Sequence, residues 1–139
     1  MEKLFVNNLM FKSELKKYLE DKNIMITGGM GMIGSNLAHK LLDYNANVTI
    51  TDALIEPYGA NMHNIEDIRD KIDLSITDIR DCEAIKFLVK DKDVIFNLAG
   101  QVSHNDSIAN PFLDADINYL GHLNVVENVK KYNPKYSIE

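Results

Sequence analysis

Four glycines within eight residues have a spacing that could do chemistry. Residues 27–34 read Thr-Gly-Gly-Met-Gly-Met-Ile-Gly, between a short apolar run and a segment of helical period. The glycines would therefore join a strand to the first turn of a helix. Free backbone N–H groups and the helix dipole favour an anion there, and a side chain would block its approach. The turn predicts a site for the pyrophosphate of a dinucleotide.

A second chemical group, Asp52, ends the next apolar run, 18 residues beyond Gly34. A carboxylate at that point can accept hydrogen bonds from the hydroxyls of an adenosine ribose, and it repels a 2′-phosphate. No arginine or lysine follows within the next several residues. This pattern predicts NAD rather than NADP, with a plain loop cap as the alternative role for Asp52.

The glycines fit two motifs that differ in register. Gly29, Gly31 and Gly34 fit G-x-G-x-x-G, whereas Thr27 with the glycines at 28, 31 and 34 fits the wider form T-G-x-x-G-x-x-G. Both forms end a strand and open a helix, so spacing alone leaves the two registers open.

Four short apolar runs would supply the strands that position these residues. They cover residues 24–27, 48–51, 72–76 and 94–98. Their lengths fit buried strands, and helical period lies between them, although residues 57–71 are looser, with only Ile65 and Ile68 as apolar anchors. The order predicts an α/β fold: a Rossmann-type doubly wound parallel sheet in three α/β/α layers, truncated after about four to five strands.

Further elements flank this alternation. Apolar residues at helical spacing before Asn23 predict an amphipathic helical extension over residues 1–22, so the incomplete dinucleotide-binding domain would cover residues 23–139. Asp81 is placed to cap the helix of the third connection. A last helix is predicted from about Phe112 to Lys131, and residues 135–139 resemble the first step into another strand.

Composition narrows the class of partner. The chain has 139 residues, a formal charge of −6 and a pI near 5.2, which disfavour non-specific affinity for nucleic acid or anionic lipid. Cys82 is the only cysteine, so an internal disulfide is impossible. The sequence shows neither a signal peptide nor an apolar stretch long enough for a bilayer. We expect a soluble, cytoplasmic chain with a small-molecule partner.

Several later segments resemble one enzyme family. They are Asp-Ile-Arg-Asp at 78–81, Asn-Leu-Ala-Gly-Gln at 97–101, Gln-Val-Ser-His at 101–104, Ser-Ile-Ala-Asn-Pro at 107–111 and Asp-Ile-Asn-Tyr-Leu-Gly at 116–121. From about Asn23 to its end, the chain resembles the extended short-chain dehydrogenases/reductases, and most closely their NAD-dependent nucleotide-sugar epimerases and dehydratases. Sugar 4-epimerases, 4,6-dehydratases and 2-epimerases acting on CDP-sugars are similar here. In that family the wider glycine register is usual.

The resemblance implies where NAD would lie along the chain. The implied cofactor-binding residues are Gly28, Gly31, Met32, Ile33, Gly34, Asp52, Asp78, Ile79, Leu98, Ala99, Gly100, Gln101 and Asn118. Backbone N–H groups of residues 32–33 would meet the pyrophosphate, and residues 78–79 would edge the adenine. Residues 98–101 would line the ribose and nicotinamide side, while Asn118 would support the neighbouring strand. Each has a local alternative, such as a turn former at position 78.

The polar loop at residues 103–111 follows the fourth strand, so we expect it to face the sugar of a nucleotide-sugar substrate. His104 lies in this loop and could titrate near neutrality, but the resemblance gives that position no chemical role and we assign none. The other histidines lack carboxylate or cysteine partners at metal-ligand spacing, so no metal site is expected.

The catalytic residues that the resemblance implies are a tyrosine, a lysine four residues further on, and a nearby serine or threonine. They would oxidise a sugar hydroxyl by hydride transfer to NAD. We expect them beyond the end of this chain, and assign no catalytic residue within it. Tyr18 and Lys22 have the spacing but precede the first strand, so we interpret them as a chance match. We expect the chain to be an inactive fragment of an enzyme that forms a homodimer.

Two alternatives remain at this point. Residues 97–100 also resemble the N-N-A-G segment of shorter-chain dehydrogenases, although Gln101-Val102 and the loop that follows argue against that branch. A non-catalytic NAD-binding or regulatory module is the alternative from another functional class. An unfinished sheet edge argues against it, because such an edge exposes unpaired backbone.

Overall fold

The computed structural model describes the backbone of residues 2–55 and 59–136, and side chains from residue 11 onward in those ranges. The strands are β1 (Asn23–Thr27), β2 (Asn47–Asp52), β3 (Asp73–Ile76) and β4 (Val94–Asn97). The helices are α1 (Glu2–Leu19), α2 (Met32–Leu42), α3 (Cys82–Leu88), α4 (His104–Ala109), α5 (Pro111–Ala115) and α6 (His122–Tyr132). Two segments have other helical forms: η1 (Met62–Lys71) is a 3₁₀-helix and η2 (Asp116–Gly121) is a π-helix.

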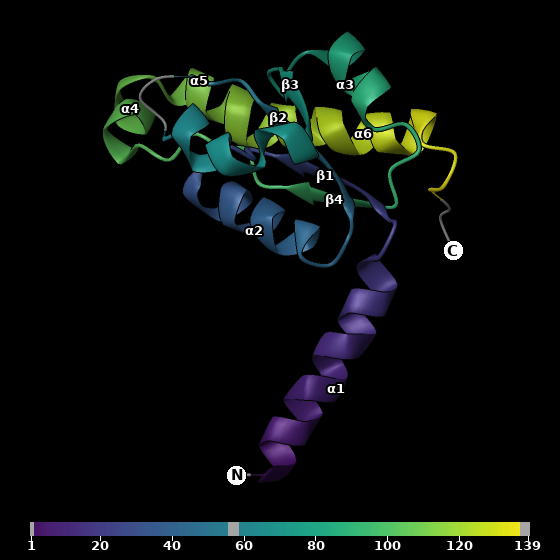
Figure 1. Ribbon diagram of the computed structural model, residues 1–139. Coiled ribbons are helices and arrows are strands. Elements are labelled where there is room, and N and C mark those ends of the chain that lie inside the picture. The colour runs from purple at the N-terminus through teal and green to yellow at the C-terminus, as the bar shows by residue number, and fades with distance from the viewer. Residues whose placement is uncertain (1, 56–58, 137–139) are drawn as a thin grey trace.

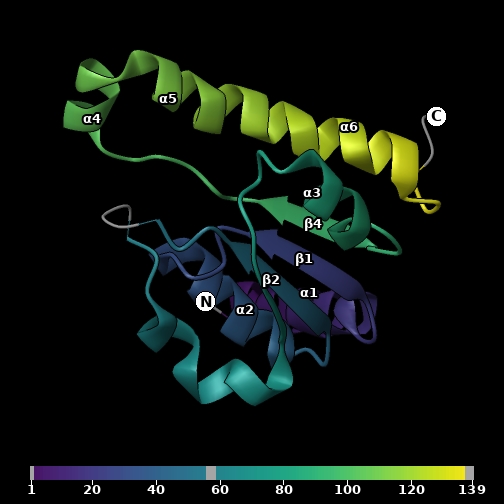
Figure 2. The same ribbon diagram turned by 90° about the horizontal axis from the view of Figure 1, so that it is seen from above.

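The strands form one parallel sheet in the order β3-β2-β1-β4 (Figure 1). The chain steps outward from β1 to β3 and then returns past β1 to form β4. The strand order therefore reverses between β1 and β4, and ligands of doubly wound folds bind at that point. Helices α2 and η1 lie on one side of the sheet and α3 and α6 on the other (Figure 2). The predicted three-layer Rossmann-type fold is confirmed.

The core divides between the two faces because side chains alternate along each strand. On one face, Ile24 and Ile26 of β1 pack with residues of β2, α2 and η1. On the other face, Met25 packs with α3 and α6 residues, including Ile85 and Val125. All three β1 side chains are fully buried, so β1 is the centre of the molecule.

The predicted connections are present, with two differences in helical form. Asp81 caps α3 as expected, its side chain accepting a hydrogen bond from Ala84 N. The looser connection contains η1, whose Ile65 and Ile68 are buried as expected, while residues 57 and 58 lie outside the described residues. The last helix runs from α5 through η2 to α6, so a π-helical segment interrupts the single α-helix that periodicity predicted.

Helix α1 extends away from the rest of the molecule (Figure 1). Its last residue, Leu19, is buried in the core, and Leu15 packs against it, whereas Phe11 and Tyr18 are exposed. At the other end, residues 135 and 136 form no strand, and residues 137–139 of the expected further strand lie outside the described residues.

Strand β4 is at the edge of the sheet, paired only with β1. Beside it lies a cavity of about 320 Å³, which we call the β4–α6 groove. The groove is lined by Lys92, Asp93, Val94, Ile95, Asn97, Val125, Val126, Val129, Asn133, Lys135 and Tyr136. All four β4 residues are only partly buried, in contrast to the buried β1.

Candidate functional site

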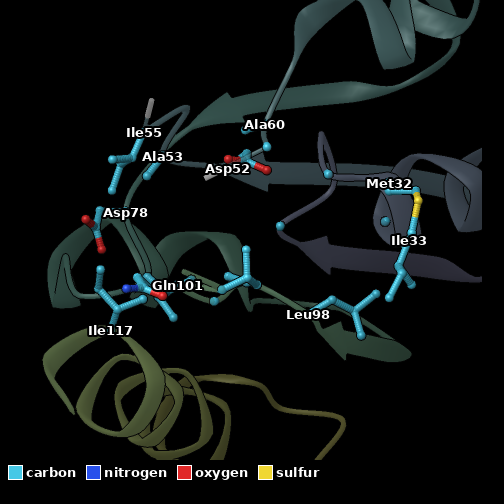
Figure 3. Close-up of a pocket in the computed structure, with 18 of the residues that line it drawn as sticks. Met32, Ile33, Asp52, Ala53, Ile55, Ala60, Asp78, Leu98, Gln101 and Ile117 are labelled. Atoms are coloured by element: carbon cyan, nitrogen blue, oxygen red, sulfur yellow. The ribbon is translucent and has the colours of Figure 1, made fainter. Parts of the chain in front are cut away.

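A second cavity, of about 350 Å³, lies where the parallel strands end (Figure 3). Its lining consists of Gly28, Gly31, Met32, Ile33, Gly34, Asp52, Ala53, Ile55, Gly59, Ala60, Thr77, Asp78, Ile79, Leu98, Ala99, Gly100, Gln101, Val102 and Ile117. We call it the strand-end cavity. Every residue that the sequence predicted for the cofactor lines it, except Asn118. The prediction therefore brought together residues from four separate segments of the chain.

The glycine turn is built so that three of its four glycines, 28, 29 and 34, are required by packing. Gly28 has a φ of +67°, and a Cβ there would lie 2.8 Å from the backbone of Ala99. A Cβ on Gly34 would collide with the carbonyl oxygen of Gly28. These glycines let the turn lie close to β4 and let helix α2 begin directly against the turn.

Gly31 has a different environment. A Cβ there would meet only Gly28 O, at 3.4 Å, which is an ordinary contact. The fold therefore leaves room at Gly31, although this residue lines the strand-end cavity. Gly29 does not line the cavity, and its Cβ would collide with Ile50. The cavity is thus bordered by glycines 28, 31 and 34, which is the wider of the two registers.

Helix α2 presents its N-terminus to the cavity. Gly31 is the N-cap and provides no side-chain hydrogen bond, and the first turn holds no acidic residue. The first N–H groups of an α-helix have no partner within the helix, and the helix dipole adds partial positive charge. Met32 and Ile33 carry such N–H groups and both line the cavity. This arrangement can bind an anionic group without any basic side chain.

Asp52 lies at the end of β2 and is almost fully buried. Its Oδ2 accepts a hydrogen bond from Met30 N, and its Oδ1 accepts one from Leu54 N, both at 3.0 Å. A carboxylate has about four acceptor positions, so each oxygen keeps about one free. Met30 O is in turn bonded by Asn64 Nδ2 at 2.8 Å, which ties the segment carrying Asp52's partner to η1.

The far end of the cavity contains Asp78 with Ile55 and Ile117, whereas Met32, Ile33 and Leu98 lie at the opposite end (Figure 3). Arg80 holds the Asp78 carboxylate in a two-pronged ion pair, with Nη2 at 2.6 Å from Oδ2 and Nε at 3.0 Å from Oδ1. These hydrogen bonds lower the pKa of Asp78. The carboxylate at this end is therefore held in the ionised form.

Gln101 and Asn118 support the cavity from its third side. Gln101 N donates to Asn118 Oδ1 at 2.8 Å, and Asn118 Nδ2 donates to Gln101 O at 2.9 Å. Asn118 therefore holds the segment after β4 from outside the cavity, in line with the supporting position that the resemblance implied. The side chain of Gln101 is itself bonded to both backbone groups of Ser103.

The polar segment at 103–111 differs from the expected loop, because residues 104–109 form helix α4. Ser103 caps this helix through Asp106 N, and Asn110 caps α5 through Leu113 N. Their side chains bond to nearby backbone groups, and this local bonding favours helix starts over an open loop. His104 is exposed on α4 and does not line the strand-end cavity.

Sequence reasoning missed seven lining residues. They are Ala53, Ile55, Gly59, Ala60, Thr77, Val102 and Ile117. Four of them adjoin a predicted residue in sequence, so adjacency was the one available signal. The others come from the segment after Asp52, and no short motif marks its path. Most are small or apolar, and they shape the walls rather than provide charge.

Tyr18 and Lys22 lie just before β1 begins, at the N-terminal end of that strand. The Lys22 ammonium group lies 5.9 Å from the centre of the Tyr18 ring and 3.9 Å from Asp93 Oδ1. The cavity is at the opposite, C-terminal ends of the strands. Within the described residues, no group of three or more potential metal ligands occurs, and no helix is long and apolar enough to cross a membrane.

Comparison with known proteins gives concordant matches. The family model described as GDP-mannose 4,6 dehydratase matches residues 25–138. A putative UDP-glucose 4-epimerase of Methanocaldococcus jannaschii is 37% identical over 110 residues, covering 79% of this chain and 34% of that protein. A CDP-paratose 2-epimerase of Salmonella typhi is 35% identical over 118 residues, covering 83% of this chain and 35% of that protein.

Solved structures agree in fold. The Bordetella bronchiseptica enzyme WbmF, solved with NAD⁺ and with NAD⁺ and UDP, has a TM-score of 0.74 and 31% identity, over 84% of this chain and 34% of its own. This chain spans about a third of the length of the curated relatives it matches. The matches confirm the predicted resemblance, and neither alternative is better supported. The chain belongs to the GDP-mannose 4,6-dehydratase family, within the NAD-dependent nucleotide-sugar epimerases and dehydratases of the extended short-chain dehydrogenase type.

Proposed function

We propose that the strand-end cavity binds NAD. The proposal rests on one observation: the uncapped N-terminus of α2, with room left at Gly31, opens on the same cavity as the buried Asp52 carboxylate. The α2 N-terminus would take the pyrophosphate, and Asp52 the adenosine ribose. Asp78 and Ile79 would edge the adenine, and residues 98–101 would line the nicotinamide side. In Figure 3, Met32 and Ile33, then Asp52, then Asp78 follow one another along the cavity.

The free acceptor positions of Asp52 support the choice of NAD over NADP. One position remains on each oxygen, and an adenosine ribose offers two neighbouring hydroxyl donors. A 2′-phosphate would replace one of these donors by an anion facing a buried carboxylate. Among the described residues that line the cavity, no lysine or arginine could compensate for this charge.

The whole protein would then be a nucleotide-sugar epimerase or dehydratase, of which this chain is the NAD-binding portion. Bound NAD supplies hydride acceptance, so that a sugar hydroxyl is oxidised to a transient keto-sugar. The printed names of the relatives support this reaction class, and WbmF has been solved with UDP as well as NAD⁺. The helical run from α5 to α6 would contribute to a homodimer interface in the full-length enzyme.

By itself this chain would turn over no sugar nucleotide. Its only tyrosine–lysine pair at the required spacing, Tyr18 and Lys22, is separated from the strand-end cavity by the length of β1. Among the residues that the structure describes, no tyrosine lines the cavity. Incubation with NAD and UDP-, GDP-, CDP- or dTDP-sugars, followed by chromatography of the products, should therefore show neither epimer nor keto-sugar. A clear rate would contradict this part of the proposal.

Calorimetric titration with NAD, NADH and NADPH tests cofactor binding. NAD and NADH should bind, and NADPH should bind at least about tenfold more weakly, since it brings unpaired charge to Asp52. Asp52→Asn should weaken NAD binding about tenfold or more, because an amide offers fewer acceptors. Asp70→Asn, which removes an exposed acidic group from η1, is the matched control and should leave the affinity unchanged. Preference for NADPH would overturn the role of Asp52.

A further inference from the structure

In the turn at residues 78–80, both oxygens of the Asp78 carboxylate accept hydrogen bonds from Arg80. Asp78 Oδ1 accepts hydrogen bonds from Arg80 N at 2.9 Å and from Arg80 Nε at 3.0 Å. Asp78 Oδ2 accepts one from Arg80 Nη2 at 2.6 Å and shares Nε at 3.1 Å. The guanidinium fork fixes both the position and the plane of the carboxylate. Asp78 therefore enters the cavity wall already oriented.

These contacts differ from those of Asp52 in what they leave free. Asp52 keeps one acceptor position on each of its two oxygens. On Asp78, Oδ1 has both of its positions used, and only Oδ2 keeps one largely free. Asp52 can thus accept from a pair of donors, such as a diol, whereas Asp78 can accept from a single donor.

The surroundings of Asp78 suit a flat ring that carries one donor. Ile55 and Ile117 lie on either side of Asp78 in Figure 3. Ile79, which follows Asp78 in the chain, also lines the cavity. No second cation lines this end, and the Asp78 side chain is about 29% exposed. The charged group beside these apolar walls is therefore an acceptor whose orientation is set by Arg80.

We propose that Arg80 is a positioning residue for base recognition: its fork orients the Asp78 carboxylate so that Oδ2 accepts one N–H from the exocyclic amino group of a 6-aminopurine. This inference rests on the proposed binding of NAD in the strand-end cavity. It adds that the orientation of this acceptor depends on Arg80, a residue that does not itself line the cavity.

The charges around the pair are few. Arg80 faces Asp78 within the turn, and Asp116 of η2 faces the guanidinium from the helix packed against it. Asp52 lies further along the cavity (Figure 3). Loss of the guanidinium would leave Asp78 with only the Arg80 backbone N–H as a donor, so the pKa of its carboxyl would rise toward its ordinary value. Protonation removes the negative charge and so weakens the acceptor, and base recognition would therefore weaken at a higher pH than in the parent chain.

The test is calorimetric titration of the full 139-residue chain with NAD and with nicotinamide hypoxanthine dinucleotide, whose base has an oxygen in place of the amino group. The parent chain should bind NAD about tenfold more tightly, the effect of one hydrogen bond to a charged group. Arg80→Gln should reduce this ratio to about threefold or less. It should also move the acid-side loss of NAD affinity to higher pH.

Two variants separate positioning from a merely structural role. Arg80→Lys keeps a positive charge without the planar fork. Its NAD affinity should therefore fall at about the same acidic pH as in the parent chain, while its preference for NAD over the hypoxanthine dinucleotide is lost. Arg69→Gln removes the chain's other arginine, which is exposed on η1, and should change neither quantity. If Arg80→Gln unfolds, Arg80→Lys alone decides the discrimination.

The outcomes are distinct. An unchanged ratio of NAD to hypoxanthine-dinucleotide affinity in both Arg80 variants overturns the inference while the proposed function stands. The inference is likewise overturned if a folded Arg80→Gln chain loses NAD affinity at the same acidic pH as the parent chain. Failure of the parent chain to bind either dinucleotide overturns the proposed function and the inference together.

Discussion

The strand-end cavity and the β4–α6 groove are nearly equal in volume, at about 350 and 320 Å³, but they differ in chemistry. The cavity is bordered by three glycines of the turn at residues 27–34, the amides of a helix N-terminus and two carboxylates whose free acceptor positions can be counted. The groove is walled by valines, with charged groups only at one end. The difference shows that volume does not identify a ligand site: the fixed donors and acceptors on its walls do.

The sharpest test of this comparison adds a side chain to the cavity without disturbing the fold. Gly31→Val places methyl groups where only Gly28 O lies within 4 Å of the Cβ. Because those groups would occupy the approach to the α2 amides, NAD affinity should fall at least about a hundredfold, which corresponds to about 2.7 kcal/mol. The free energy of unfolding should fall by only about 1 kcal/mol, through the altered N-cap.

The measurements are calorimetric titration with NAD and urea unfolding followed by circular dichroism. A Gly31→Val chain that binds NAD normally would show that the space beside this glycine is not used by the cofactor.

Gly34→Ala should give the opposite result, with a loss of stability. Its Cβ would collide with the carbonyl oxygen of Gly28, which is backbone and cannot move aside as a flexible side chain could. We expect the free energy of unfolding to fall by about 2–3 kcal/mol, at the upper end of overpacking costs. Urea unfolding measures it, with Gly31→Ala as the control, which should be far less affected. Equal stability of the two variants would contradict this account of the turn.

Val126→Lys tests the groove. Val126 lines the groove and is half exposed on α6, so a lysine can extend into solvent without unfolding the helix. Fluorescence of a dye that binds apolar surface should fall several-fold, since a charge now crosses the valine wall. NAD affinity should stay within about twofold of the parent. A Val126→Lys chain that loses NAD binding would show that the two regions are coupled.

The smallest effect concerns the contact between α2 and η1, where His39 of α2 meets Asp67 of η1. His39 Nδ1 lies 2.7 Å from Ser35 O and Nε2 lies 2.9 Å from Asp67 Oδ1. Both partners are acceptors, so the doubly protonated ring satisfies both, and the pKa of His39 is raised by the Ser35 and Asp67 hydrogen bonds. This contribution to stability is present below pH 6.5 and is lost as the pH rises through the folded-state pKa.

Titration of the His39 ring proton by NMR should give a midpoint above 6.5 in the parent chain. Asp67→Asn should move the midpoint down, and the pH dependence of the melting temperature above pH 6.5 should become shallower. A midpoint that does not respond to Asp67→Asn would remove this link between α2 and η1. The effect on stability should be small, because the pair is exposed.

The features that sequence predicted well are those with local causes. The glycine turn, the run ending at Asp52 and the Asp81 cap each follow from neighbouring residues, and periodicity located all four strands. The π-helical form of η2 depends on how the last helix meets the rest of the molecule, which periodicity does not contain. Helix α4 was missed because the capping groups that start it, such as Ser103, are also common in loops.

The site shows the same division. Motif positions such as Gly31 and Asp52 carry distinct chemistry and could be found along the chain. Ile55 and Ile117 carry none, and they come together only because the sheet brings distant segments to one edge. Asp78 and Arg80 both lie within a recognised motif, but the sequence does not determine the two-pronged geometry of their ion pair.

One hydroxyl group sets how this site can adapt to a ligand. Thr27 Oγ1 donates to Asn97 Oδ1 at 2.8 Å and accepts from Leu98 N and Ala99 N at 2.9 and 3.1 Å, so all of its hydrogen-bonding positions are used. It joins the ends of β1 and β4 at the floor of the cavity, where spreading would break three bonds at once. The ends of β1 and β4 are therefore held rigidly together. Any opening or closing of the cavity around a ligand must come from the other segments that line it.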